Sequence, residues 1–295
     1  VESSTIKKDL IRRDFSINAM AIELKENKLI DLFSGLEAIS NSTIQFLHEN
    51  SVLDDPTRII RASRYSAKLD FVLENSSLEQ IQNTLNSWPW SWKIGDKPDL
   101  APSALSTRLK MELELLFKSK DWENALTKLK LWDALKIIDK KLQDNNSLIE
   151  KISIAKKSNI EPLTAFIYES ENPIYHSERL KFTQLQKEII KGACELNKLL
   201  RNISDKENYA TWSPSKWTDI LEGINVNESS YILEISRNKT LKKYLSSWFY
   251  NWKNIKSPIR GNDLIAKGWK SGKDIGAEIR RERMKLIDEQ NITLK

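Results

Sequence analysis

The sequence is poor in residues that cross-link a chain or bind transition metals. It has one cysteine, Cys194, and two histidines, His48 and His176. A single cysteine excludes an internal disulfide framework and suits a reducing compartment. So few cysteine and histidine side chains also argue against zinc fingers and histidine-rich hydrolase centres.

Long apolar runs are missing as well. No stretch approaches the ~20 apolar residues that a membrane-spanning helix needs. The first four residues, Val-Glu-Ser-Ser, lack the basic-then-apolar order of a secretion signal. We therefore predict a cytoplasmic protein.

The chain carries 47 Lys+Arg against 41 Asp+Glu, a net charge of +6, which is a weak indication of a polyanionic partner.

The apolar pattern predicts a mainly α fold. Residues 1–33 are typical of strands, and 16–32 read as a β-hairpin around a polar turn. From about residue 51 the apolar residues recur at spacings of three and four, as in helices. Helices are expected at 54–69, 77–86, 103–118, 121–140, 147–157, 180–202, 215–223, 228–247 and 272–289. Proline-rich breaks separate several of them, including breaks near Pro162 and Pro173.

A compact polar motif lies in residues 9–21, which read DLIRRDFSINAMA. Arg12, Arg13 and Asp14 come just before the predicted hairpin, and Asn18 follows four residues later. Guanidinium groups pair with phosphate oxygens, while a carboxylate and an amide can bind ribose hydroxyls. Taken alone, the same cluster is more often a surface ion pair.

A second motif lies in residues 51–65, where Pro56 preceded by an aspartate predicts a helix start. At ~100° per residue, one half of the predicted helix carries Asp55, Arg58, Arg61 and Arg64. A carboxylate there can accept from the exocyclic amine of a base, and the arginines can donate to ring atoms or phosphates. A solvated basic helix face is the alternative interpretation.

Together the two motifs resemble those of the class II tRNA nucleotidyltransferase and poly(A) polymerase family. That family carries RRDFTINA, DPFGG and EDPLRxLRAxRFxxxLGF in this order. The present chain has RRDFSINA at 12–19, DLFSG at 31–35 and a segment from Asp54 to Phe71 that begins DDPTR. Residues 103–116, with Arg108 and Glu112, look like the family's neck-stabilising helix motif, and 261–276 are similar to its tail segment.

The resemblance implies a head, neck, body and tail. We expect residues 1–50 to be the C-terminal part of a nucleotidyltransferase head, with a short β-hairpin. An all-helical remainder would follow: a nucleotide-selecting neck at 51–118, a body at 119–202, and a tRNA-binding tail at 203–295.

The resemblance also implies roles for individual residues. Arg13 would contact the nucleotide phosphates and Asp14 the ribose, while Asp55 and Arg58 would pair with the Watson–Crick edge of CTP or ATP. Arg61 and Arg64 would complete the nucleotide site. Supporting residues would be Arg12, Asn18, Asp54, Arg108 and Glu112, and phosphates of the RNA would meet Lys267, Lys270 and Lys273. Asp54 stands where the family has glutamate, one methylene longer.

The implied reaction adds CCA, or part of it, to tRNA 3′ ends from CTP and ATP without a nucleic-acid template. In the family, Mg²⁺ ions for this reaction are held by an Asp-x-Asp pair. No Asp-x-Asp occurs in the 295 residues. We therefore predict that this chain contains no catalytic metal ligands and adds no nucleotides by itself, the head segment being absent or encoded separately.

Several alternatives stay open at this point. CCA addition, CC addition, A addition and poly(A) synthesis share the motifs described above. A non-catalytic, tRNA-binding helical protein would use the basic tail alone, and a purely structural helical scaffold would leave the arginine motif as ordinary surface.

Overall fold

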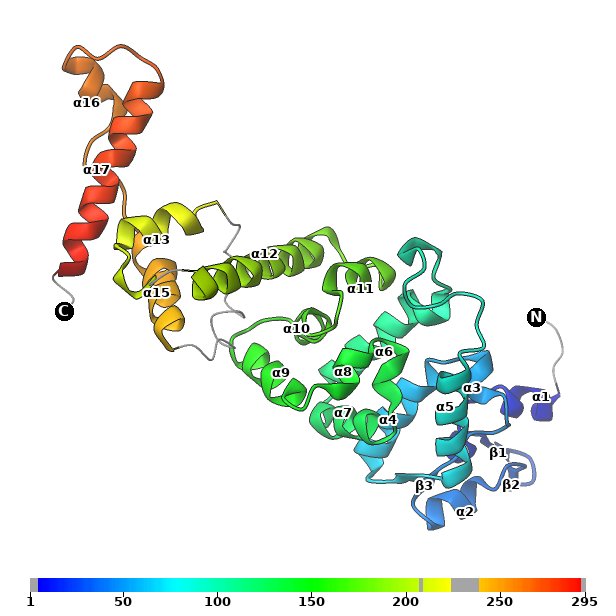
Figure 1. Cartoon of the computed structure of the whole chain (residues 1–295). Coiled ribbons are helices and arrows are strands. Elements are labelled where there is room, and N and C mark those ends of the chain that lie inside the picture. The colour runs from blue at the N-terminus through cyan, green and yellow to red at the C-terminus, as the bar shows by residue number, and fades with distance from the viewer. Residues whose placement is uncertain (1–4, 207–208, 224–238, 293–295) are drawn as a thin grey trace. The chain divides into compact units, whose positions relative to one another are not determined.

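A computed structural model describes residues 5–206, 209–223 and 239–292. The predicted mainly α fold with a short hairpin is confirmed (Figure 1). The chain divides into two compact units, one formed by residues 1–156 and 161–187 and the other by 157–160 and 188–295. Within the described ranges, no helix is long and apolar enough to cross a membrane.

Two small sheets belong to the first unit. Strands β1 (Met20–Glu23) and β2 (Lys28–Asp31) are antiparallel, with Met20 opposite Asp31. This pair confirms the predicted hairpin, with shorter strands. A second, parallel pair joins β3 (Thr43–Ile44) to β4 (Val72–Leu73). An isolated bridge between Phe15 and Phe46 then ties the first motif to the segment after β3.

The prediction of strands throughout residues 1–33 is wrong at its start, where helix α1 (Ile6–Ile11) forms. The Thr5 hydroxyl accepts from the backbone N–H of Lys8 and caps the helix. Asp9 then pairs with Arg12 and Arg13, three and four residues further on. Short-range side-chain contacts of this kind favour a helical turn, and the apolar pattern does not show them. Residues Ser16–Asn18 form a 3-10 turn, η1, before β1.

The DLFSG segment is a turn that packs against the first motif. The Asp31 carboxylate accepts from the backbone N–H groups of Gly35, at 2.8 Å, and of Leu36, at 2.9 Å. Bonds from the backbone N–H groups of Leu36 and Gly35 keep the pKa of Asp31 below its ordinary value despite partial burial. A Cβ at Gly35 would lie 2.5 Å from the carbonyl oxygen of Ser16, so only glycine fits beneath that backbone.

The predicted helix 54–69 is interrupted by Asp55 and Pro56. It consists of α3 (Ser51–Asp54) and α4 (Arg58–Leu69). Asp55 is extended, with φ −147° and ψ 92°, because the residue before a proline is pushed out of the helical region. Asp55 therefore precedes α4 instead of lying on its arginine-bearing face.

The rest of the first unit is helical. Its elements are α2 (Gly35–Ser40), α5 (Asn75–Ser87), η2 (Pro98–Leu100), η3 (Ser103–Leu105), α6 (Thr107–Lys118), α7 (Trp122–Leu131), η4 (Ala134–Ile137), α8 (Lys140–Asp144), α9 (Leu148–Lys157), α10 (Pro162–Tyr168) and α11 (Pro173–Arg179). The predicted helix 121–140 is broken at Asp133, whose φ is +59°. Pro162 and Pro173 begin helices, since proline fits the first helical position.

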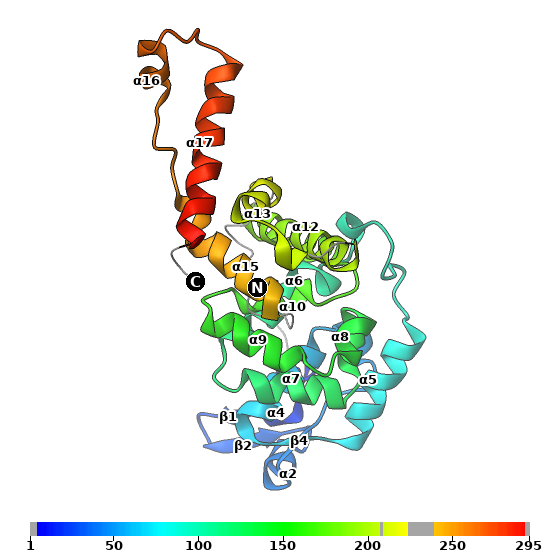
Figure 2. The ribbon, with the colours of Figure 1, turned by 60° about the vertical axis from the view of Figure 1, so that its left-hand side comes forward.

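Helix α4 packs on α6 and α7, and the buried side chains between these helices form the core of the first unit (Figure 2). Ile59, Ile60 and Ala62 of α4 are fully buried, as are Leu109 and Leu113 of α6. This apolar face fixes the rotation of α4 and leaves its arginines on the other side. Helix packing therefore positions the candidate site.

The second unit contains most of α12 (Gln184–Lys206), then η5 (Tyr209–Thr211), α13 (Pro214–Leu221), α15 (Lys239–Tyr250), η6 (Trp252–Asn254), α16 (Gly261–Ala266) and α17 (Lys273–Ile292). Its core is aromatic: Trp217 is fully buried and stacks on Tyr244 at 5.2 Å between ring centroids. Of the predicted helix 228–247, residues 228–238 lie outside the described residues. The division into head, neck, body and tail stays a prediction.

Candidate functional site

A cavity of about 540 Å³ opens in the first unit where the two polar motifs meet. It lies between the segment after α1, the loop before α4, the exposed face of α4 and the first turn of α6. The lining residues are Arg12, Arg13, Asp14, Asn18, Asp55, Arg58, Arg61, Tyr65 and Arg108. Residues separated by almost a hundred positions thus share one polar chamber.

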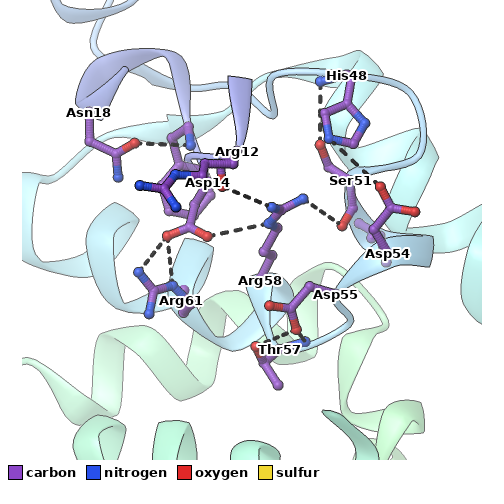
Figure 3. Close-up of polar contacts among 12 residues, drawn as sticks. Arg12, Asp14, Asn18, His48, Ser51, Asp54, Asp55, Thr57, Arg58 and Arg61 are labelled. Carbon is purple, nitrogen blue, oxygen red and sulfur yellow. Dashed lines mark hydrogen bonds and ion pairs between the residues drawn. The ribbon is translucent and has the colours of Figure 1, made fainter. Parts of the chain in front are cut away.

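Asp14 joins the two motifs. Its neighbour Phe15 is fully buried and contacts the rings of Phe46 and Tyr65, with centroids 5.7 and 5.5 Å away. With Phe15 anchored in the core, the Asp14 carboxylate accepts from Arg58 Nε at 3.3 Å and from Arg61 Nε at 2.8 Å (Figure 3).

Arg58 is almost fully buried and is held by three partners. Besides Asp14, it donates to the carbonyl oxygens of Ser51, at 3.1 Å, and of Arg12, at 3.3 Å (Figure 3). A guanidinium has five N–H donors, so three are used here and two remain. Arg58 therefore stabilises the site and retains donors for a ligand.

Arg61 lies between two carboxylates. It donates to Asp14 and, at 3.0 Å, to Glu112 of α6, which also accepts from Arg64. Burial alone would lower the pKa of Arg61, but the Asp14 and Glu112 charges outweigh it and raise that pKa. Glu112 is buried beside the cavity, and Arg64 does not line the cavity. The predicted supporting residue Glu112 thus orients both arginines.

Asp55 also lines the cavity, although it lies outside α4. One carboxylate oxygen accepts from the backbone N–H and the hydroxyl of Thr57, at 3.2 and 2.7 Å (Figure 3). The other accepts from Arg108 on α6. The short loop before α4 therefore fixes the orientation of this carboxylate.

The remaining predicted residues occupy different positions. Arg12 and Arg13 line the cavity and pair with Asp9, whose pKa is lowered by its hydrogen bonds from Arg13 and Arg12. Asn18 accepts from the backbone N–H of Phe15 at 3.2 Å, which holds the motif's backbone. Asp54 does not line the cavity; its carboxylate is exposed and lies 3.9 Å from His48 Nε2 (Figure 3).

The cavity lining is strongly cationic. Five guanidiniums (Arg12, Arg13, Arg58, Arg61 and Arg108) face two carboxylates (Asp14 and Asp55), an excess of three positive charges. Such a chamber attracts a polyanion through several charge-assisted hydrogen bonds. Its fixed acceptor at Asp55 and the donors of Arg58 add sites for a neutral polar ring.

The carboxylates of this cavity do not fit a divalent cation. Asp14 directs both oxygens to Arg58 and Arg61, and Asp55 directs its oxygens to Thr57 and Arg108. Throughout the ranges that the structure covers, no three His, Cys, Asp or Glu side chains gather as metal ligands would. We assign no step to Mg²⁺ in these residues.

The predicted RNA-binding lysines lie in the second unit. Lys267 and Lys270 are exposed between α16 and α17, and Lys273 is exposed at the start of α17; none of the three forms an ion pair with another described residue. Trp269 lies between them and is 40% exposed. Because its side chain is exposed, Trp269 is available for contact with a partner. The same unit has three buried tryptophans, Trp217, Trp248 and Trp252.

Two residues of the site were missed from the sequence: Tyr65, which lines the cavity, and Thr57, which binds the Asp55 carboxylate. Tyr65 follows Arg61 by four positions, a spacing that places it on the same helix face and could have revealed it. Thr57 caps the Asp55 carboxylate through an Asp-Pro-Thr turn, whose pattern of side-chain to backbone bonding is typical of turns.

Comparison with known proteins agrees with this geometry. The family model described as "Poly A polymerase head domain" matches residues 1–45. An A-adding tRNA nucleotidyltransferase of Aquifex aeolicus is 27% identical over 97% of this chain and 35% of its own length. A Halalkalibacterium halodurans enzyme of the same name is 34% identical over 46% of this chain and 31% of its own length. The chain spans about a third of the length of these curated relatives.

Solved structures extend the similarity over nearly the whole chain. A CCA-adding enzyme in an apo form has a TM-score of 0.66 at 26% identity, covering 98% of this chain and 69% of that one. A Thermotoga maritima CCA-adding enzyme complexed with tRNA has a TM-score of 0.63 at 26% identity, over 97% of this chain and 70% of that one. The two motifs, their meeting in one cavity and these similarities agree with one another. The chain is similar to class II tRNA nucleotidyltransferases over nearly its whole length.

Proposed function

We propose that this chain is the nucleotide-selecting and tRNA-binding part of an enzyme that adds CCA, or part of it, to tRNA 3′ ends. CTP and ATP would be the substrates, and no nucleic-acid template would be used. One observation carries the proposal: Asp14 binds Arg58 and Arg61, which brings the RRD motif and the DPTR motif around one cationic cavity.

The cavity offers a pattern that suits cytosine and adenine. Both bases present an exocyclic amine beside an unprotonated ring nitrogen, whereas uracil and guanine present a carbonyl beside a ring N–H. Asp55 supplies an acceptor, and Arg58 has two donors left. An acceptor next to a donor pairs with cytosine and adenine. The same arrangement leaves polar groups unpaired when uracil or guanine is bound. Each unpaired group costs about 1–3 kcal/mol.

The other cationic groups suit the triphosphate. Arg12 and Arg13 are exposed at the cavity mouth and would meet phosphate oxygens, while Asp14 would accept from a ribose hydroxyl. Arg64 lies outside the lining and would act through Glu112. We propose Asn18 and Glu112 as supports of the site, for the hydrogen bonds described above.

The comparisons support these substrates and partners. CCA-adding enzyme structures with CTP and with ATP are each 26% identical to this chain at a TM-score of 0.64. Two A-adding enzymes and a CCA-adding enzyme match over most of the chain, and a CC-adding enzyme matches over 25% of it. The proposal therefore covers addition of A, CC or CCA. For tRNA, it relies on the exposed Lys267, Lys270 and Lys273.

A titration of the four ribonucleoside triphosphates against the chain tests this function. We expect CTP and ATP to bind more tightly than UTP and GTP, and Arg58→Ala to abolish the preference. Because Arg58 is buried, the variant must first be shown to be folded by circular dichroism. Binding of tRNA with no response to any nucleotide would instead favour a non-catalytic RNA-binding protein.

The predicted inactivity needs a separate assay. Incubation with Mg²⁺, CTP, ATP and tRNAs lacking CCA, CA or A should show no extension by the 295 residues alone. Extension of one of these tRNAs at ordinary rates would disprove that prediction. It would also identify which nucleotides the enzyme adds.

A further inference from the structure

Arg108 and Asp55 form an ion pair inside the cavity across 53 residues of sequence. Asp55 lies in the loop before α4 and its side chain is 15% exposed, whereas the Arg108 side chain on α6 is 51% exposed. Both residues line the cavity. The carboxylate is thus held in place, and its cationic partner reaches it from a solvated position.

The two oxygens of Asp55 have partners of different kinds. Oδ1 is bound by the N–H and hydroxyl of Thr57, which is only two residues away and 2% exposed. Oδ2 is bound by Arg108, a long side chain free to adopt other rotamers in water. A ligand can therefore displace the second partner far more easily than the first.

The position of Arg108 at the start of α6 favours its ion pair with Asp55. Arg108 is the second residue of α6, at the positive end of the helix dipole, where a cation is disfavoured. Among the described residues, Asp55 is its ion-pair partner. The contact therefore compensates a charge that the helix itself does not favour.

We propose that Arg108 is an internal ligand that occupies Asp55 Oδ2 until the exocyclic amine of cytosine or adenine replaces it. The exchange substitutes one N–H donor for another at the same oxygen. Uracil and guanine would bring a carbonyl oxygen to this position and cannot replace the donor. Base selection would then depend on two effects: competition between Arg108 and the base amine for Asp55 Oδ2, and direct pairing of the base with Asp55 and Arg58.

This inference rests on the proposed function, because it assumes that Asp55 faces the base. It adds a quantitative expectation. A partly exposed ion pair contributes little, so its release would weaken nucleotide binding by up to about fivefold. Removing Arg108 should recover that factor for CTP and ATP only, because UTP and GTP do not displace the arginine.

The test compares three variants by equilibrium titration with each nucleotide. Arg108→Ala removes the competitor, and Arg108→Lys keeps a cation at the same position. Lys118→Ala removes one exposed charge from the far end of the same helix. We expect Arg108→Ala to bind CTP and ATP about two- to fivefold more tightly, with UTP and GTP unchanged. The other two variants should stay close to the wild type.

Each other outcome has a definite meaning. Weaker or unchanged CTP and ATP binding in folded Arg108→Ala would overturn the inference and leave the proposed function intact. An equal gain for all four nucleotides would also overturn it, since the exchange would then not depend on the base. No binding of CTP or ATP by the wild type would remove the proposed function, and the inference with it.

Discussion

Asp14 Oδ2 accepts a hydrogen bond from Arg61 Nε at 2.8 Å, although 47 residues separate the two side chains. The same carboxylate binds Arg58, and Arg61 continues to Glu112. Carboxylates and guanidiniums thus alternate from the segment after α1, across α4, to α6. These ion pairs therefore hold the side chains of the cavity in position before a nucleotide binds.

Asp14→Asn should destabilise the first unit strongly. The Asp14 and Arg58 side chains are 16% and 9% exposed, so the change leaves a largely buried guanidinium without its counter-charge. We expect the free energy of unfolding to fall by about 3 kcal/mol, measured by urea denaturation of both proteins.

Asp9→Asn is the matched control for that experiment. Asp9 also accepts from two arginines, but Arg12 and Arg13 are 74% and 51% exposed. Surface pairs contribute little, so this variant should unfold close to the wild type. Equal effects of the two substitutions would contradict the idea that the Asp14 pairs organise the cavity.

Asp55→Ala and Arg13→Ala should separate base selection from phosphate binding. Without Asp55, the preference for CTP and ATP over UTP and GTP should fall about ten- to a hundredfold, from the loss of one or two paired groups. Without Arg13, all four nucleotides should bind more weakly by a similar factor. The dissociation constants of the four nucleotides check both expectations. A uniform loss of affinity in both variants would show that the roles are wrongly assigned.

Arg179→Met should destabilise the first unit through the loss of hydrogen bonds to buried backbone carbonyls. Arg179 is fully buried and donates to the carbonyl oxygens of Leu105, Ile137 and Ile138, at 2.9, 2.9 and 3.2 Å. Burial lowers its pKa to about 10, so the side chain stays charged at neutral pH. Methionine would leave three buried carbonyls without a donor, and we expect a loss of about 3–5 kcal/mol in urea denaturation.

Two further variants define the cause of that loss. Arg179→Lys keeps the charge but cannot reach three carbonyls in one plane, so it should recover only part of the stability. Lys140→Met changes an exposed cation on α8 and should have little effect. Full recovery by lysine would mean that charge, and not the forked geometry, is what this site requires.

Asp139 should make stability depend on pH in the acid range. Burial opposes its charged form, but the hydrogen bond from His176 and the backbone N–H groups of Glu171 and Leu142 outweigh it and lower the pKa of Asp139 from 3.8. A lowered carboxylate pKa means that folding favours the ionised form. The resulting stability is present above about pH 4 and is lost as pH falls through the folded-state pKa.

Asp139→Asn removes this titration. The wild-type free energy of unfolding should therefore fall more steeply between about pH 5 and pH 2 than that of the variant. Urea denaturation at several pH values measures both slopes. Parallel curves would show that another carboxylate governs acid unfolding.

The amino-acid pattern predicted the helices best where a buried face is long and uninterrupted. Helices α4, α5, α6 and α9 lie within a few residues of their predicted ranges. The failures came where local bonding outweighs apolar periodicity. Thr5 and Asp9 create α1 through polar contacts, and Pro162 begins α10 where the sequence predicted only a break.

Much of the candidate site was predictable because its residue types carry the chemistry. Asp14, Asp55, Arg58 and Arg61 line one cavity, as their grouping suggested. Their pairing was not predictable, because it depends on how α4 and α6 pack across about fifty residues. Only the folded chain shows that Arg108 binds Asp55 and that Glu112 holds Arg61 and Arg64.

Residues 267–273, from the end of α16 to the start of α17, should give tRNA binding a measurable dependence on salt. Replacing Lys267, Lys270 and Lys273 together by alanine removes up to three phosphate contacts. The slope of log K against log salt should then become shallower by about two to three units, at ~0.7–0.9 per contact. Trp269→Ala should weaken binding without changing this slope, because stacking on a base releases no counterions. If the lysine variant kept the wild-type slope, these side chains would not contact RNA, and any loss from Trp269→Ala would have to reflect packing of the loop itself.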